Sequence, residues 1–157
     1  MQQYKQTSLI YSALFIGQLL FAVLVVWMIT TGKAANATEG YRSYTFEQLP
    51  LIIALTGLTG AFLMNRLRTT QGAGLENIGR VLQHYHTTVI LRSAILEGCN
   101  LIVLTLALLH GNLLYLIYFG LGMAGFLYFR PSPEGLAKEY GLTRQQEAEL
   151  KRIVGEK

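Results

Sequence analysis

Four long apolar runs dominate the pattern of hydrophobic and polar positions along the chain. A helix of about 20 apolar residues crosses the ~30 Å hydrocarbon core of a bilayer, so runs of this length are typical of transmembrane helices. The pattern predicts an all-α, polytopic membrane protein whose residues 1–130 form four transmembrane helices in an antiparallel bundle. The expected spans, with flanking turns added, cover about residues 9–31, 47–66, 87–109 and 112–129.

The segments that follow the second and third runs predict how the helices are joined. The tripeptide 110–112, His-Gly-Asn, is short enough to join the third and fourth spans as a helical hairpin. Between about residues 75 and 86 apolar side chains recur at helical spacing. They predict an amphipathic cytoplasmic helix that either lies on the membrane surface or extends the third span.

The polar tail, residues 131–157, predicts two short cytoplasmic helices. Ser132 is suited to cap the first, with a proline in its first turn, and Gly141 to end it. Thr143 and Gln146 have the spacing of a capping box for the second. Two readings of the tail remain open: a solvated extension, or a docking element for a partner.

The distribution of basic residues predicts the orientation in the membrane. The chain has 13 Lys and Arg, nine acidic residues that are all glutamate, and a net charge of +4. Basic residues are frequent between the second and third runs and after the fourth, whereas the turn after the third run has none. Basic loops stay cytoplasmic, so we expect a bacterial inner-membrane protein with both termini in the cytoplasm. Nucleic acid is not an expected partner, because there is no basic stripe with interleaved aromatics on a soluble module.

The third run carries one carboxylate, Glu97, near its middle. An ionised glutamate at mid-membrane costs roughly 2.5–3.5 kcal/mol, so its side chain is expected to face other helices or a water-filled pocket. At about 100° per residue, His86, Ser93 and Asn100 share one helix face with Glu97. We predict an intramembrane polar stripe of these four residues, with Gln18 of the first run as a neighbour of Glu97.

Arg92 lies outside this stripe. It is separated from Glu97 by five positions, about 140° around a helix, which strains an ion pair within the helix. Near the cytoplasmic boundary its long side chain can reach the headgroups. Arg92 is therefore predicted to be an interfacial anchor, with a functional pair with Glu97 as the alternative.

Small residues recur four positions apart in the second and fourth runs. This spacing lets helix backbones approach closely in membranes. The predicted helix-packing residues are Gly57, Gly60, Gly120 and Ala124. The single cysteine, Cys99, excludes an internal disulfide and is expected to be a small buried hydrophobe.

The sequence contains no recognisable set of catalytic, metal-binding or cofactor-binding residues. His84 and His86 lie near one end of the third span and His110 lies at the other, so no two histidines face each other as a bis-histidine haem would need. There is no zinc spacing, no serine–histidine–acid set and no phosphate-binding glycine loop. The chain has no aspartate and only one membrane-depth glutamate, so it cannot supply the two carboxylates of a hydrolase site. No catalytic residue, metal or cofactor is predicted.

Two resemblances can be named from quoted segments. The order of NRLR, YHTTVILRSAILEG, HGNLLYLIYFGL and RPSPE resembles small, uncharacterised four-span inner-membrane proteins of bacteria. That resemblance covers most of the chain and implies no activity. The segment AILEGCNLIVLTLALL resembles the carboxylate helix of rotary ATPase proteolipids, which implies that Glu97 would carry an ion. The glycine-rich partner helix of the proteolipids is missing here, and the acid lies on the third helix rather than the last.

These features predict a non-enzymatic structural or accessory membrane subunit, in a homo-oligomer or a larger complex within the lipid bilayer. The alternative is a proton- or cation-coupled transport component that uses Glu97. An enzyme or cofactor carrier is a third class. A hydrogen bond from Gln18 or Arg92 to the polar stripe would favour the assembly role. A hydrated cavity beside the stripe would favour transport.

Overall fold

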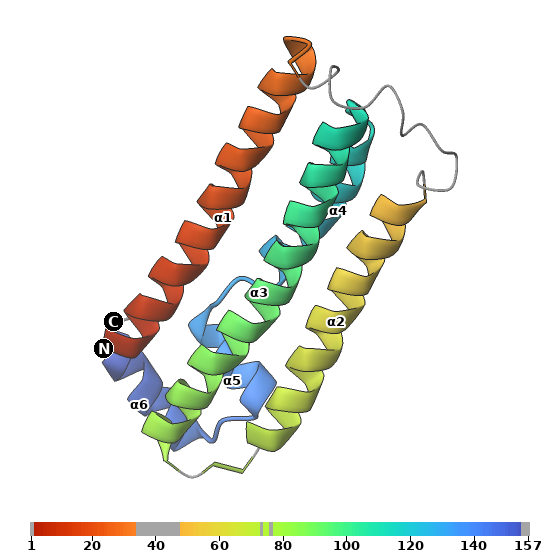
Figure 1. Ribbon diagram of the computed structural model, residues 1–157. Helices are drawn as coiled ribbons and strands as arrows, with labels where there is room; N and C mark the ends of the chain where they lie inside the picture. Colours follow the sequence, from red (N-terminus) through yellow and green to blue (C-terminus); the bar gives the residue numbers. More distant parts are fainter. Residues whose placement is uncertain (1, 34–47, 73, 76, 155–157) are drawn as a thin grey trace.

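The structure of the chain is a computed structural model that describes residues 2–33, 48–72, 74–75 and 77–154. The described residues form six helices and no strand (Figure 1). The helices are α1 (Gln2–Thr30), α2 (Leu49–Gly72), α3 (Ile78–His110), α4 (Tyr115–Tyr128), α5 (Pro133–Tyr140) and α6 (Arg144–Val154). Three of them, α1, α2 and α3, are long and apolar enough to cross a membrane. The chain is thus an all-helical protein with the helix lengths and composition of a membrane protein.

The fourth apolar run forms a shorter helix than the other three. α4 has 14 residues, which is about 21 Å at 1.5 Å per residue. It is joined to α3 by a tight turn in which Gly111 adopts the left-handed conformation, with φ 59°. The side chain of Asn112 accepts a hydrogen bond from the backbone of Leu114 within this turn, at 3.0 Å. The predicted hairpin is confirmed, because α3 and α4 pack against each other.

α3 is the central helix and contacts α1, α2 and α4 (Figure 1). α1 runs beside it in the same direction, because Thr7 contacts His86 and Gln18 contacts Asn100 further along both helices. α2 and α4 run opposite to α3. Gly57 and Gly122 face Cys99 and Asn100 of α3. Asn65 and Phe129, which come later in the chain, contact Arg92, which comes earlier in α3.

The segment before the third apolar run is part of α3. Asn77 caps the helix, its side chain accepting a hydrogen bond from the backbone of Gly79 at 2.8 Å. From Ile78 onward the helix continues without interruption to His110, over 33 residues. Residues 78–86 belong to the same helix as the third span, so of the two predicted arrangements the structure adopts the extension of that span.

The tail folds back onto the other helices. The predicted caps are confirmed: Ser132 accepts from the backbone of Gly135, Gly141 is left-handed, and Thr143 and Gln146 form the reciprocal hydrogen bonds of a capping box. α5 packs against α2, and α6 packs against α3 and α5. The apolar edge of this tail is buried, with Leu136 at 0% and Leu150 at 2% exposure. The described part of the tail is therefore not a solvated extension.

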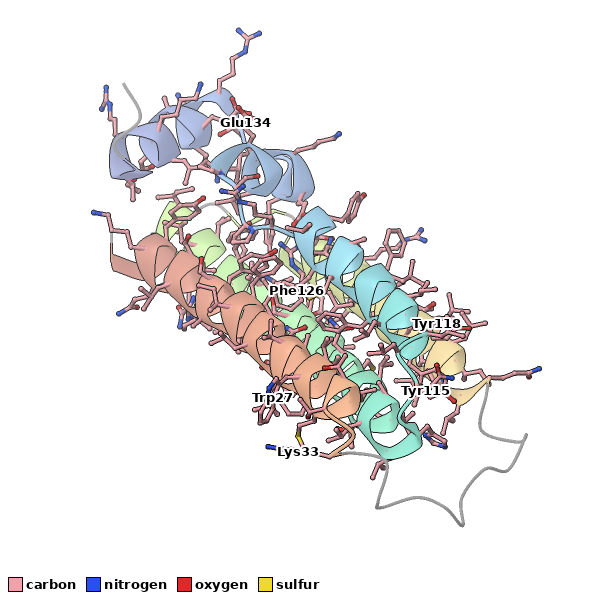
Figure 2. The ribbon with its side chains drawn as sticks, turned by 90° about the horizontal axis from the view of Figure 1, so that it is seen from above. Trp27, Lys33, Tyr115, Tyr118, Phe126 and Glu134 are labelled. Atoms are coloured by element: carbon pink, nitrogen blue, oxygen red, sulfur yellow. The ribbon has the colours of Figure 1, made fainter. Side chains whose placement is uncertain are left out.

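Two apolar clusters make up the interior. One joins the tail to the nearer halves of α1, α3 and α4 and contains Tyr85, Val89, Phe126, Leu136 and Leu150. The other lies towards the far end and contains Val25, Val103, Leu104, Tyr115 and Phe119. Figure 2 shows Trp27, Lys33, Tyr115 and Tyr118 at this far end, away from α5 and α6. Large apolar side chains remain exposed on the outer faces of α1, α2 and α4, as a lipid-facing surface requires.

Candidate functional site

Arg92 is a buried charged residue of α3 that contacts three other parts of the chain. Its side chain is only 1% exposed. One guanidinium nitrogen donates to Asn65 Oδ1 at 2.6 Å and lies 3.2 Å from the Glu139 carboxylate, and the other donates to the carbonyl of Phe129 at 2.9 Å. These three partners come from α2, from α5 and from the end of α4.

This environment corrects the prediction of an interfacial anchor for Arg92. The guanidinium does not extend to the surface, because α5 covers it and supplies its counter-charge. The alternative pair with Glu97 is also wrong, since the ion pair is made with Glu139. The rings of Tyr85 and Phe129 pack over the guanidinium at 5.8 Å and 5.2 Å and add cation–π attraction.

Tyr140, the last residue of α5, binds the tail to α3 through its hydroxyl. Its hydroxyl lies 2.9 Å from His84 Nδ1 and 3.1 Å from Thr88 Oγ1. Gly72, the last residue of α2, leaves room for the ring, because a Cβ at this position would overlap it. Burial raises the pKa of the Tyr140 hydroxyl above its ordinary value, and the hydrogen bond to Thr88 acts in the opposite direction. Tyr140 is therefore a neutral hydroxyl at physiological pH.

A second polar contact lies deeper among the helices. Asn100 Nδ2 donates to Gln18 Oε1 at 2.7 Å, and both side chains are only 1% exposed. The sulfur of Met123 lies 3.7 Å from the same nitrogen. Gly122 makes this possible, because a Cβ there would overlap the Asn100 amide. Gln18 was predicted beside Glu97; the structure pairs it with Asn100 instead.

The other members of the predicted stripe follow the same buried face of α3. His86 Nδ1 lies 2.6 Å from Thr7 Oγ1, which ties α3 to α1. Ser93 is buried, at 2% exposure. Three of the four stripe residues thus face the neighbouring helices.

Glu97 differs from the rest of the stripe. Its side chain is partly exposed and makes no hydrogen bond or ion pair to any residue in the described part of the chain. It lies 19 residues after Ile78 and 13 before His110, about 28 Å and about 20 Å along the axis. At mid-membrane an ionised carboxylate without a partner costs roughly 2.5–3.5 kcal/mol. The structure does not supply the group that would offset this cost.

The predicted packing glycines separate into two groups. Gly57 and Gly60 face α3: a Cβ at Gly57 would lie 2.7 Å from that of Cys99, and one at Gly60 would lie 3.3 Å from Ile95. Gly120 has open space around it, and Ala124 is exposed. α4 contacts its neighbours through Gly122 and Gly125 instead, because its helical rotation places Gly120 and Ala124 outward.

Grooves open on the surface of the described residues. One, of about 640 Å³, lies between α5 and α6 and is lined by Glu134, Lys138, Glu147 and Lys151 together with apolar residues. Another, of about 420 Å³, lies between α2 and α4 and is mostly apolar. No cluster of three or more His, Cys or Glu side chains that could hold a metal occurs within the described residues.

Sequence reasoning missed the partners of Arg92. Asn65 lies at the end of the second predicted span, and Glu139 lies in the predicted tail, with no pattern that connects either to Arg92. One signal was present: Leu136, Glu139 and Tyr140 lie three and four apart, on one face of α5. A buried leucine and tyrosine on the same face as a glutamate indicate that the glutamate is covered as well.

No family model, curated protein or solved structure matches the chain. The length and apolar composition of α1, α2 and α3 are compatible with a membrane helical protein. Any more specific function has to be inferred from the contacts described above.

Proposed function

We propose that the chain is an integral protein of the bacterial inner membrane, with four spans in an antiparallel bundle and a non-enzymatic role as a structural or accessory subunit. The first three spans correspond to α1, α2 and α3. The fourth is α4 together with the turn before it, and a short span of this kind is accommodated by local thinning of the bilayer. α5 and α6 then form a cap on the cytoplasmic side.

The positions of the charged residues support this orientation. The start of α1, the connection between α2 and α3, and the two tail helices lie at one end of the molecule (Figure 1). That end carries most of the basic residues in the described part of the chain, namely Lys5, Arg66, Arg68, Arg80, Arg130, Lys138, Arg144, Lys151 and Arg152. Under the positive-inside rule this end is cytoplasmic.

The accessory role rests on one observation: Asn100 and Arg92, two polar residues of α3 that face inward, are bound within the chain. Asn100 is held by Gln18, and Arg92 by Asn65, Glu139 and the Phe129 carbonyl. Interhelical hydrogen bonds of this kind hold membrane helices together. These bonds occupy Asn100 and the terminal nitrogens of Arg92 in packing. Two atoms, Gln18 Nε2 and Arg92 Nε, are buried without a hydrogen-bond partner among the described residues.

A second function, proton- or cation-coupled transport, is favoured by Glu97 alone. Its carboxylate has no partner in the described part of the chain, and intramembrane carboxylates of this kind can mark ion paths. Transport through this residue would require water or a cation to reach it from both sides.

Ion flux in reconstituted vesicles distinguishes the two functions. Wild-type protein, Glu97→Gln and Glu149→Gln are placed in vesicles that contain a pH-sensitive dye, and a membrane potential is imposed in sodium or potassium buffer. The control, Glu149→Gln, removes an exposed carboxylate of α6. We expect the three proteins to give the same flux as empty vesicles. A proton flux, with or without dependence on sodium, that is present in wild type and in Glu149→Gln but lost in Glu97→Gln would overturn the accessory role.

A further inference from the structure

One face of α3 is left open by the other described helices. Its residues are exposed and recur three and four positions apart: Leu91, Ala94, Gly98, Ile102, Thr105 and Leu109. α1 and α2 lie on either side of α3, and α4 lies behind it (Figure 1). The open face therefore runs lengthwise between α1 and α2.

Glu97 lies at the edge of this open face. It directly precedes Gly98, and no atom of another helix lies within 4 Å of where a Cβ of Gly98 would be. Ala94, one turn earlier, is also exposed. A foreign helix could therefore bring its backbone close to α3 here, within reach of a carboxylate that has no partner among the described residues.

We propose that this open face of α3 docks a transmembrane helix of another protein that carries a lysine or arginine at mid-membrane depth, with Glu97 as its counter-charge. The proposal rests on the accessory role, and it names the chemistry of the partner. A lysine or arginine of the partner helix would supply the positive charge that the Glu97 carboxylate lacks. The two small residues beside Glu97, Ala94 and Gly98, would allow the partner backbone to come close to α3.

A second copy of this chain does not fit the same requirement. Among the described residues, the exposed lysines and arginines lie at the helix ends and in the tail. Two arginines are not exposed: Arg68 is half-buried near the end of α2, and Arg92 is buried and paired with Glu139. A second copy would place at Glu97 either an apolar face or another carboxylate.

The test uses the single tryptophan of the chain, Trp27, which is 52% exposed on α1, as an energy donor. Full-length protein in phosphatidylcholine vesicles is titrated with synthetic leucine-rich transmembrane peptides that carry an acceptor dye and lack tryptophan. One peptide has a lysine at its centre and the other has leucine there. We expect the lysine peptide to quench Trp27 at about tenfold lower peptide-to-lipid ratio than the leucine peptide.

Three variants make the result specific. Glu97→Gln should remove the preference for lysine. Gly98→Leu should weaken binding of the lysine peptide although Glu97 is retained, because the new side chain fills the open face. Thr56→Val, an exposed position on α2, should change nothing. Equal quenching by the two peptides, or a lysine preference that survives both Glu97→Gln and Gly98→Leu, would overturn the proposal.

Self-association of the wild type that is lost in Glu97→Gln, without any preference for the lysine peptide, would also overturn it and would identify a second copy as the occupant. Failure of this test leaves the accessory role standing, because that role is decided by the flux measurement. Conversely, a flux lost in Glu97→Gln would refute the accessory role whatever the peptides do.

Discussion

The ion pair between Arg92 and Glu139 predicts how firmly the tail is held to the bundle. In Glu139→Gln the counter-charge is removed while Arg92 stays buried, at 1% exposure. A hydrogen bond to a charged group contributes about 1.5–3 kcal/mol. The low end of this range applies, because the Glu139 side chain is 28% exposed and Arg92 keeps Asn65 and the Phe129 carbonyl as acceptors. The expected cost is therefore about 1.5–2 kcal/mol, or roughly a 10- to 30-fold larger population with α5 released.

Hydrogen–deuterium exchange of the α5 amides measures this population directly. When opening and closing are fast compared with exchange, the exchange rate follows the free energy of opening. We expect the α5 amides to exchange about 10- to 30-fold faster in Glu139→Gln, while the middle of α1 is unchanged. Glu149→Gln is the matched control, since Glu149 is exposed on α6.

Three outcomes would refute this reasoning. If α5 exchanges at the wild-type rate in Glu139→Gln, the ion pair does not hold the tail. If Glu149→Gln has the same effect as Glu139→Gln, the effect comes from net charge rather than from the buried contact. A slowing of exchange would mean that Arg92 is better satisfied by the amide than by the carboxylate.

Two further predictions follow from the close contacts. Gly122→Ala should lower the thermal unfolding midpoint in detergent, because the new Cβ would overlap the Asn100 amide. Gly98→Ala is the control and should leave the midpoint unchanged, because Gly98 faces open space. Equal midpoints for the two variants would contradict the overlap. Tyr140→Phe removes the hydroxyl that bonds to Thr88 and should speed α5 exchange by an amount corresponding to about 1 kcal/mol. Because the folded pKa of Tyr140 is raised, its contribution is present below about pH 10 and is lost as the pH rises through the folded value. The wild type should therefore lose α5 protection at high pH, and that part of the loss should be missing in Tyr140→Phe.

The sequence by itself determined the local features of this protein. The lengths of the apolar runs predicted three long helices. An apolar run of about 20 residues is typical of a helix that crosses a bilayer. Ser132, Gly141 and the Thr143–Gln146 box set the ends of the tail helices, because caps depend only on groups a few residues apart. The shared face of Ser93 and Asn100 followed from the helical repeat, which is also a local property.

Only the tertiary structure decided which polar groups meet. Asn100 and its partner Gln18 are 82 positions apart, and Arg92 and Glu139 are 47 apart. The spacing of residues within a helix gives the face on which a side chain lies. It does not give the rotation and register of one packed helix against another, nor the position to which a tail folds back. For that reason the sequence could place Glu97 and Asn100 on one stripe, while the packing of α1, α4 and α5 bound Asn100 and Arg92 and left Glu97 at the edge of an open face.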